Sequence, residues 1–136
     1  MSKITTQQFN TIIKNEIEWA SSLNVTLERV EQGKAVMRMP YHKSSTRPGG
    51  SISGPHIMLL SDICMYAVVL SSIGEVKLAV TTNFNINFLR KPMESDLIAE
   101  GKIIKLGKRL AIMEVSAFSN DAIVAHATGT YSIPPV

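Results

Sequence analysis

The strongest chemical signal in the sequence is one acidic residue, Asp62, inside an apolar run from Ile57 to Ile73. Moving a carboxylate out of water is unfavourable, and a carboxylate kept in an apolar site is often there to do chemistry. A structural carboxylate that is hydrogen-bonded within the core is the alternative. On the residues alone, the two interpretations are equally open.

The run around Asp62 is predicted to form a helix. Pro55 suits the first helical position, because the N–H that proline lacks would be unpaired there. Gly54 is then the expected N-cap, and Gly74 stands where the helix should end. The helix is apolar on nearly every side, so we expect it to be buried. It is too short and too polar to cross a bilayer comfortably.

The start of this helix is a candidate site for a developing oxyanion, because unpaired N–H groups and the positive end of the helix dipole meet there. The N–H of Gly54 is the best candidate donor, since glycine lets a ligand approach the backbone closely. Pro55 has no N–H, so His56 would supply the only other donor nearby.

The remaining sequence predicts the elements that position this helix. A first helix should run from Thr5 to about Ser21, and a loop rich in Ser, Gly and Pro should cover 41–53. Alternation of apolar and polar residues predicts strands at 25–31, 34–40, 97–106, 109–118 and 123–133, and another that starts at Thr82 and ends at Lys91-Pro92. The order predicts one α+β domain over residues 1–136, with a curved antiparallel sheet wrapped around one long buried helix.

The charge pattern favours a small anionic ligand over a nucleic acid. The net charge is only +3, and the basic residues collect at Arg90 and Lys91 and again between Lys102 and Arg109, a segment that includes Lys108. Such clusters suit a phosphate-bearing ligand, although solvated strand ends are an equally good interpretation. They are too sparse for duplex nucleic acid, and no aromatic residues alternate with them as in single-strand-binding proteins.

Cysteine and histidine usage argues against a metal site. Cys64 is the one cysteine, so a disulfide framework and a cysteine-based metal site are excluded, and a reducing cytoplasm is the expected location. We interpret Cys64 as a small buried hydrophobic residue. The three histidines, His42, His56 and His126, lack the spacing of metal ligands, and the first residues lack the pattern of a secretory signal.

The order of elements resembles the hotdog fold, and three motifs resemble acyl-CoA thioesterases of the phenylacetate-degradation (PaaI-like) type. SGPHIMLLSD matches the family's helix opening and its acid; AVTTNFNINFLRKP matches the strand that follows; LGKRLA matches a Gly-Lys/Arg turn between two later strands. Ser53 stands where many members have His, Pro55 where they have a second Gly, and His56 where a small or apolar residue is common.

The resemblance implies a cofactor-free, metal-independent enzyme that hydrolyses the thioester of an aryl- or fatty-acyl-CoA. In that family Asp62 corresponds to the nucleophile or general base, Gly54 to the oxyanion site, and Thr81 to a hydroxyl that positions the water or the carboxylate. The phosphates of CoA would lie against Arg90 and Lys91 and against the turn that holds Lys108 and Arg109.

The resemblance also implies an oligomer without nucleic-acid or membrane partners. Hotdog proteins form homodimers with a continuous sheet, and often dimers of dimers. The active site would then span two chains, with Gly54 of one chain near Asp62 and Thr81 of the other.

Two residues beside Gly54 invite a different chemistry. Ser53 would need a positioned base to act as a nucleophile, and no nucleophile elbow or triad is present, so we expect a loop serine that hydrogen-bonds to substrate. His56 lies six residues before Asp62 and therefore off its helix face, which favours a satisfied or solvent-reaching histidine beside the substrate. A hotdog protein that binds acyl-CoA without hydrolysis is the main alternative function, and a hotdog hydratase or dehydratase is a third.

Overall fold

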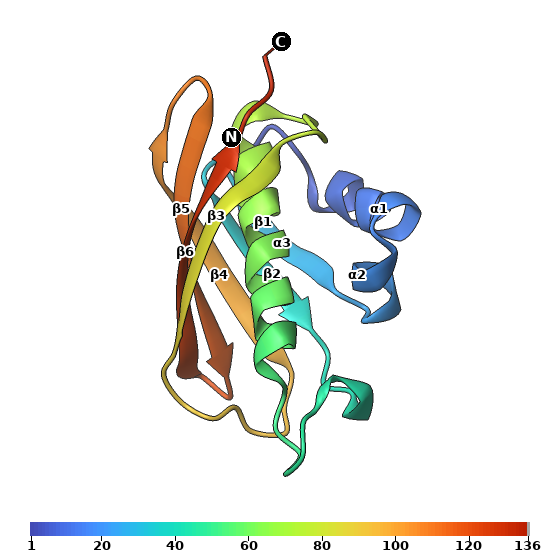
Figure 1. The fold of residues 1–136 in the computed structure, drawn as a ribbon. Helices are drawn as coiled ribbons and strands as arrows, with labels where there is room; N and C mark the ends of the chain where they lie inside the picture. Colours follow the sequence, from blue (N-terminus) through green and yellow to red (C-terminus); the bar gives the residue numbers. More distant parts are fainter. Residues whose placement is uncertain (136) are drawn as a thin grey trace.

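Helix α3 (Gly54–Ile73) crosses one face of a six-stranded antiparallel sheet that curves around it (Figure 1). The structure, a computed structural model, describes residues 1–135. Across the sheet the strands are β1 (Thr26–Glu31), β2 (Lys34–Met39), β4 (Leu97–Leu106), β5 (Leu110–Ser119), β6 (Ala122–Ser132) and β3 (Val80–Phe88). Every neighbouring pair is antiparallel. The predicted fold is confirmed.

Two glycines of the sheet let α3 lie close against it. A Cβ added to Gly101 of β4 would lie 2.9 Å from a methyl group of Val68, and one added to Gly129 of β6 would lie 2.5 Å from the sulfur of Met65. Both are shorter than ordinary contacts between carbon or sulfur atoms. The buried side chains of α3 therefore pack directly on sheet backbone at these two points.

Helix α3 begins one residue earlier than the sequence predicts. Ser53 is the N-cap, with φ −70° and ψ 151°, and its Oγ accepts a hydrogen bond from the His56 N–H at 3.3 Å. Gly54 is therefore the first helical residue, and the prediction that it caps the helix is wrong. The physical reason is that a serine side chain can accept this bond, whereas glycine has no side chain with which to do so. The predicted end at Gly74 is confirmed.

The predicted first helix is divided in two. Helices α1 (Thr6–Glu16) and α2 (Glu18–Ser22) meet at Ile17, whose φ of −126° and ψ of 76° are not helical. The break redirects α2 so that Ala20 is buried while its neighbour Trp19 stays partly exposed. Both helices lie on the same side of the sheet as α3 (Figure 1).

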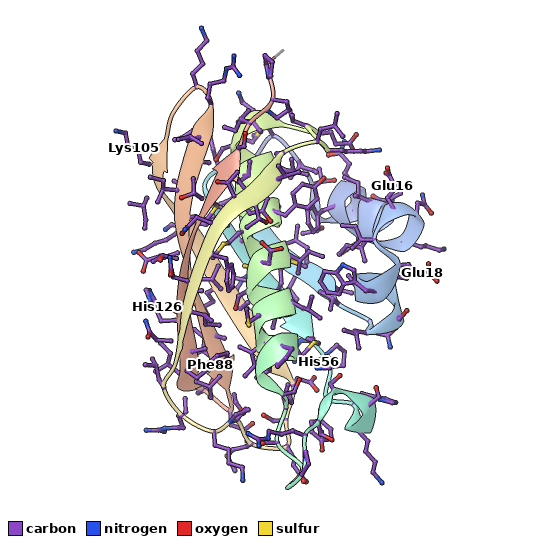
Figure 2. The ribbon with its side chains drawn as sticks, in the orientation of Figure 1. Glu16, Glu18, His56, Phe88, Lys105 and His126 are labelled. Carbon is purple, nitrogen blue, oxygen red and sulfur yellow. The ribbon has the colours of Figure 1, made fainter. Side chains whose placement is uncertain are left out.

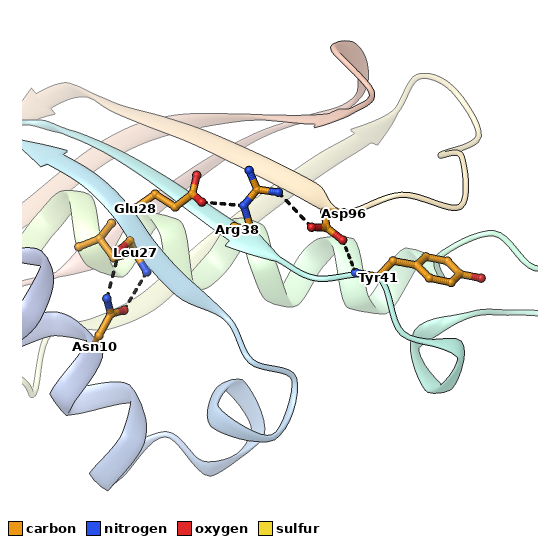
Figure 3. A network of polar contacts seen from close by, with 6 residues as sticks. All are labelled: Asn10, Leu27, Glu28, Arg38, Tyr41 and Asp96. Atoms are coloured by element: carbon orange, nitrogen blue, oxygen red, sulfur yellow. Dashed lines mark hydrogen bonds and ion pairs between the residues drawn. The ribbon is translucent and has the colours of Figure 1, made fainter.

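Two polar contacts fix the chain around the edge strand β1 (Figure 3). The Asn10 side chain of α1 donates to the Leu27 carbonyl at 3.1 Å and accepts from the Leu27 N–H at 2.8 Å. Arg38 of β2 bridges Glu28 and Asp96, whose carboxylate also accepts the Tyr41 N–H at 2.7 Å. The second contact anchors the start of the predicted loop, in which the structure adds one short 3-10 turn, Lys43–Ser45.

Strand β3 forms the other edge of the sheet. It starts at Val80, two residues before the predicted start, and it pairs with β6 alone. Phe84 and Ile86 pack against the core, whereas Asn83, Asn85 and Asn87 are exposed, as the alternation predicts. The free side of β3 leaves a row of unpaired backbone groups, which folded proteins usually protect or pair.

The close approach at Gly129 makes a stability prediction. We expect Gly129→Ala to lower the free energy of unfolding by about 1–3 kcal/mol, because the new methyl group overlaps Met65 and core side chains tolerate little added volume. Thr128→Ala, on the opposite face of the same strand, is the matched control and should change stability by less than half as much. Urea unfolding of both variants measures the difference. Equal stability of Gly129→Ala and wild type would show that α3 has room to move away from the sheet.

Candidate active site

Asp62 is held by two hydroxyl groups from the sheet. The Thr81 Oγ1 of β3 donates to Asp62 Oδ1 at 2.7 Å, and the Tyr131 hydroxyl of β6 lies 3.0 Å from the same oxygen. Thr81 and Tyr131 face each other in the ladder between β3 and β6, so strand register places both hydroxyls under one turn of α3. Asp62 itself is half-buried. The predicted association of Asp62 with Thr81 is present in the structure, whereas Tyr131 was not identified from the sequence.

A cleft of about 520 Å³ opens beside Asp62. The apolar part of its wall comes from the N-terminal helices and from the segment that leads into β3, and it includes Ile12, Ile17, Trp19, Leu78 and Val80. Lys77 and Glu16 also line it and form an ion pair with each other at 2.6 Å. The cleft therefore offers a carboxylate next to a largely apolar surface, which suits a substrate with an apolar group beside its reacting bond.

A second cleft, of about 700 Å³, surrounds the N-terminal end of α3. Gly54 lines it together with three cationic residues, Arg47, Arg90 and Lys91. Within residues 1–135 no group accepts a hydrogen bond from the Gly54 N–H. This end of the helix therefore combines a free N–H, the positive helix terminus and three positive side chains, which together favour an anion.

Arg47 was missed by the sequence prediction. It belongs to a tight turn in which its N–H donates to the Ser51 carbonyl and its own carbonyl accepts from the Gly50 N–H, each at 2.9 Å. The sequence signal was limited to Pro-Gly-Gly after Arg47, which predicts a tight turn; the approach of Arg47 to Gly54 depends on the tertiary structure.

Ser53 and His56 contact each other instead of facing Asp62. Ser53 Oγ lies 2.5 Å from His56 Nδ1, and the His56 N–H donates to both the Ser53 carbonyl and Ser53 Oγ. His56 therefore does not offer the second free N–H that the sequence suggested for an oxyanion. Among the described residues no carboxylate contacts this histidine, so a serine–histidine pair is present without the third member of a triad.

One protomer does not bring the two halves of the predicted site together. Gly54 and Asp62 are eight residues apart on one helix, which corresponds to roughly 12 Å along its axis. They line different clefts. The basic residues are separated as well. Lys108 and Arg109 precede Leu110, which pairs with Ser132 of β6, and Ser132 pairs in turn with Val80 at the start of β3. Arg90 and Lys91 follow Phe88, at the other end of β3.

Figure 2 shows this separation through Lys105 and Phe88, which lie toward opposite ends of the sheet. From the strand rise, the two basic groups are roughly 25 Å apart along β3. The two basic groups therefore do not meet within a single chain, and their joint contact with the phosphates of CoA stays a prediction for a site that spans two chains.

None of the three histidines lines either cleft. His42 caps the 3-10 turn, and His126 on the outer face of the sheet donates from Nε2 to Glu114 at 2.8 Å (Figure 2). In the part of the chain that the structure describes, no group of three His, Cys, Asp or Glu side chains could hold a metal ion. Cys64 is fully buried, and burial raises the pKa of its thiol, as expected for a packing residue.

The comparison with family models decides the family. The thioesterase superfamily model matches residues 49–125, which include helix α3, whose residues line both clefts, and most of the sheet. The chain belongs to the thioesterase superfamily. This membership confirms the predicted class of enzyme, a thioester hydrolase, and the predicted hotdog fold.

Individual relatives agree with this family. A crystal structure of a "putative thioesterase" from Silicibacter sp. TM1040 is 33% identical, covers 99% of this chain and 95% of its own, and superposes with a TM-score of 0.89. A "putative esterase" of Saccharolobus solfataricus is 29% identical over 96% of this chain and 86% of its own length. The PaaI protein of E. coli, from the phenylacetic acid degradation operon, is 20% identical, covers 95% and 92% of the two chains, and has a TM-score of 0.84, which supports the fold.

By length and composition alone α3 is long and apolar enough to cross a membrane, so the sequence interpretation that it is too short and too polar to do so is wrong. In the structure two thirds of its most apolar stretch is buried against the rest of the protein, and it serves as the core helix.

The His126–Glu114 contact makes a pH prediction. The hydrogen bond from His126 lowers the pKa of Glu114 below its ordinary value of 4.5. A carboxylate with a lowered pKa in the folded state stabilises the protein above pH 4.5, and this contribution is lost as the pH falls through the lowered value. We expect the difference in Tm between wild type and Glu114→Gln to shrink below pH 4.5. Glu100→Gln, on the same outer face, is the control and should show no such change. A Glu114→Gln difference that stays constant from pH 7 to pH 3 would contradict the contact.

Proposed function

We propose that the protein hydrolyses aryl- or fatty-acyl-CoA thioesters, with Asp62 as the nucleophile or general base and the Gly54 N–H as the oxyanion donor. The observation that carries this proposal is the Asp62 carboxylate. It is anchored on one oxygen by Thr81 and Tyr131, and it stands beside a largely apolar cleft within a thioesterase fold. An anchored carboxylate at the edge of an apolar space suits proton transfer or attack at a bound acyl group.

The chemistry needs only groups that this chain supplies. As a general base, Asp62 takes a proton from water while the water oxygen bonds to the thioester carbon, and the carbonyl oxygen becomes an oxyanion. The C–S bond then breaks, and the proton passes from the carboxyl group to the thiolate. As a nucleophile, Asp62 instead attacks the thioester carbon, and the C–S bond breaks so that the thiolate leaves and a mixed anhydride remains. Water then hydrolyses the anhydride, which releases the acid, restores the Asp62 carboxylate and supplies the proton that the thiolate takes up. In both routes a helix N–H stabilises the developing negative charge.

The two clefts fit the two ends of an acyl-CoA. The apolar wall next to Asp62, which includes Trp19 and Leu78, suits the acyl group. The cations around Gly54, namely Arg47, Arg90 and Lys91, suit the phosphates of CoA.

Strand β3 offers the surface on which a dimer would complete the site. Thr81, next to Asp62, lies near the start of β3, and Phe88, whose ring would lie 3.3 Å from a Cβ added to Gly54, lies at its end. If two copies of the exposed edge pair antiparallel about a two-fold axis, the end of one β3 meets the start of the other. Such pairing would bring Gly54 of the partner subunit toward Asp62.

The same pairing would reunite the basic residues. Arg90 and Lys91 of the partner subunit would come to the end of the sheet at which Lys108 and Arg109 lie. A dimer of this kind would therefore bring together the basic substrate-binding residues that lie far apart within one chain. We propose a homodimer of this geometry as the active unit, with further pairing into a dimer of dimers.

Replacing Asp62 by Asn tests the catalytic role. Asn is nearly isosteric and keeps a carbonyl oxygen for the hydroxyls of Thr81 and Tyr131, but it is a poor base and a poor nucleophile. We expect kcat to fall by roughly 10²–10⁴, with a Tm equal to or above that of wild type because no ionised carboxylate remains to be half-buried. Free thiol release from a panel of aryl- and fatty-acyl-CoAs measures the rate.

Asp121→Asn is the matched control. Asp121 is an exposed turn residue with φ of +65°, a conformation that Asn accepts readily, so rate and Tm should both remain at the wild-type level. A destabilised Asp62→Asn protein with near-normal kcat would place the chemistry on another residue.

Mixing two inactive variants tests whether the site spans the dimer. Gly54→Pro removes the proposed oxyanion N–H, and Ser53 already has the extended ψ of 151° that a following proline requires. Because a Cβ at this position would lie 3.3 Å from the Phe88 ring and the residue precedes Pro55, the circular dichroism spectrum and Tm of the variant alone must first match those of a folded protein. After unfolding and refolding an equal mixture of Gly54→Pro and Asp62→Asn chains, half of the dimers should be mixed, and each should hold one intact site. We expect recovery of about a quarter of wild-type activity. Each variant refolded alone is the control, and no recovery in the mixture would place both groups in one chain's site.

Binding of acyl-CoA without hydrolysis is a second candidate function. One observation favours it: Pro55 has no N–H and the N–H of His56 is used by Ser53, so only Gly54 offers a donor at the helix start. A rise in Tm with acyl-CoA in the absence of thiol release would identify this function.

A further inference from the structure

We propose that Tyr131 is a positioning residue that divides the Asp62 carboxylate into one fixed oxygen and one working oxygen. The inference rests on the proposed function and assigns the reaction to Oδ2. Nothing in the sequence motifs points to Tyr131, which lies 69 residues after Asp62 and contacts it through the fold alone.

The two oxygens of Asp62 have different surroundings. Oδ1 accepts from Thr81 Oγ1 at 2.7 Å and from the Tyr131 hydroxyl at 3.0 Å. Within residues 1–135, no group donates a hydrogen bond to Oδ2. Ser45 Oγ is the one buried side-chain oxygen or nitrogen in these residues that lacks a hydrogen-bond partner, so Oδ2 is not buried. Oδ2 is therefore reached by solvent on the side of the cleft that Asp62 lines. One carboxylate oxygen is occupied by the protein, and the other is free to take a proton or bond to carbon.

Tyr131 fixes the side chain of Asp62 relative to its own backbone. The same hydroxyl lies 3.0 Å from the Asp62 carbonyl oxygen, so its single proton is shared between the main chain and the carboxylate. This bridge favours one side-chain conformation of Asp62. A carboxylate without it would rotate and exchange its two oxygens, and a fixed geometry is what a proton acceptor needs to meet a bound water or acyl group.

The position of Tyr131 is itself fixed. Only 3% of its surface is exposed, and its ring stacks on Tyr66 of α3 with centroids 6.2 Å apart. Tyr66 in turn packs against Phe9 of α1 at 5.7 Å. Burial, and after it the charge of Asp62, raise the pKa of Tyr131, so the phenol keeps its proton. The charged residues that share the cleft, Glu16 and Lys77, are paired with each other at 2.6 Å.

Tyr131→Phe tests the proposal, because it removes the hydroxyl and keeps the ring. We expect kcat to fall about tenfold, the effect of one hydrogen bond to a charged group, while KM stays within about twofold because the aromatic wall remains. A fall in kcat at nearly constant KM, in protein that folds to the same extent as wild type, is the result expected of a positioning residue. A residue that only supports the fold would change the amount of active protein and leave the kcat of the folded fraction unchanged.

Tyr41→Phe is the matched control. It removes a phenol that donates to a carbonyl, that of Gly50 at 3.3 Å, and it lies outside the Asp62 cleft. Its kcat and KM should equal those of wild type. If Tyr131→Phe is too unstable to assay, Thr81→Val and Thr81→Ser test the same oxygen from the other side: loss of the hydroxyl in Val should lower kcat, and its retention in Ser should restore it.

A substrate-free measurement separates this proposal from the proposed function. The NMR coupling constants about χ1 of Asp62 should indicate one rotamer in wild type and in Tyr41→Phe, and averaging over several rotamers in Tyr131→Phe. Absence of thioesterase turnover in wild type together with this averaging in Tyr131→Phe would overturn the enzymatic function and retain the clamp on Oδ1. Unchanged coupling constants, or an unchanged kcat in folded Tyr131→Phe, would overturn the role of Tyr131.

Discussion

Helix α3 has apolar residues on all of its sides, so the protein must cover it on all sides, and most of the architecture follows from this constraint. The sheet covers one side at very short distance, because Gly101 and Gly129 leave space for Val68 and Met65. The N-terminal helices lie beside it on the same face of the sheet (Figure 1). Coverage is incomplete only along the strip that includes the half-buried Asp62 and the exposed Met58. The functional group of the helix lies where its packing is incomplete, so the carboxylate remains accessible.

The half-burial of Asp62 explains its contacts. A carboxylate in a largely apolar wall is unfavourable unless donors compensate for the lost water. Thr81 and Tyr131 supply two donors to one oxygen, and the cleft leaves the other oxygen accessible. One oxygen of the carboxylate therefore has the contacts of a structural acid, and the other is left for the proposed chemistry, so the two interpretations of Asp62 are compatible.

The exposed edge of β3 and the divided site are two aspects of one geometry. Helix α3 carries Gly54 near one end of β3 and Asp62 near the other, because helix and strand run side by side over this length. A single chain cannot fold either end onto the other without breaking α3. Two-fold pairing of β3 would join unlike ends without any change within the chain, and it would satisfy the unpaired strand edge at the same time.

The sequence by itself determined the features that depend on local pattern. The length and burial of α3, its end at Gly74 and the alternation along β3 follow from periodicity and from signals at the ends of elements. The association of Asp62 with Thr81 was predicted from the resemblance of their motifs to the thioesterase family. Local pattern also explains two of the misplaced boundaries, those at Ser53 and at Ile17. Both Ser53 and Gly54 are acceptable N-caps by composition, and the backbone break at Ile17 interrupts a run that is uniformly helical in its apolar spacing.

Only the tertiary structure decided which distant groups share a site. Tyr131 reaches Asp62 because β6 pairs with β3 in one register, and a shift by one residue would turn its hydroxyl to the opposite face of the sheet. Arg47 joins Gly54 through a turn, and Lys108 is separated from Arg90 by the length of a strand although both are basic residues near strand ends. Side-chain type and spacing state which chemistry is available. Strand register and helix placement decide which atoms meet, because they depend on contacts between residues far apart in the chain.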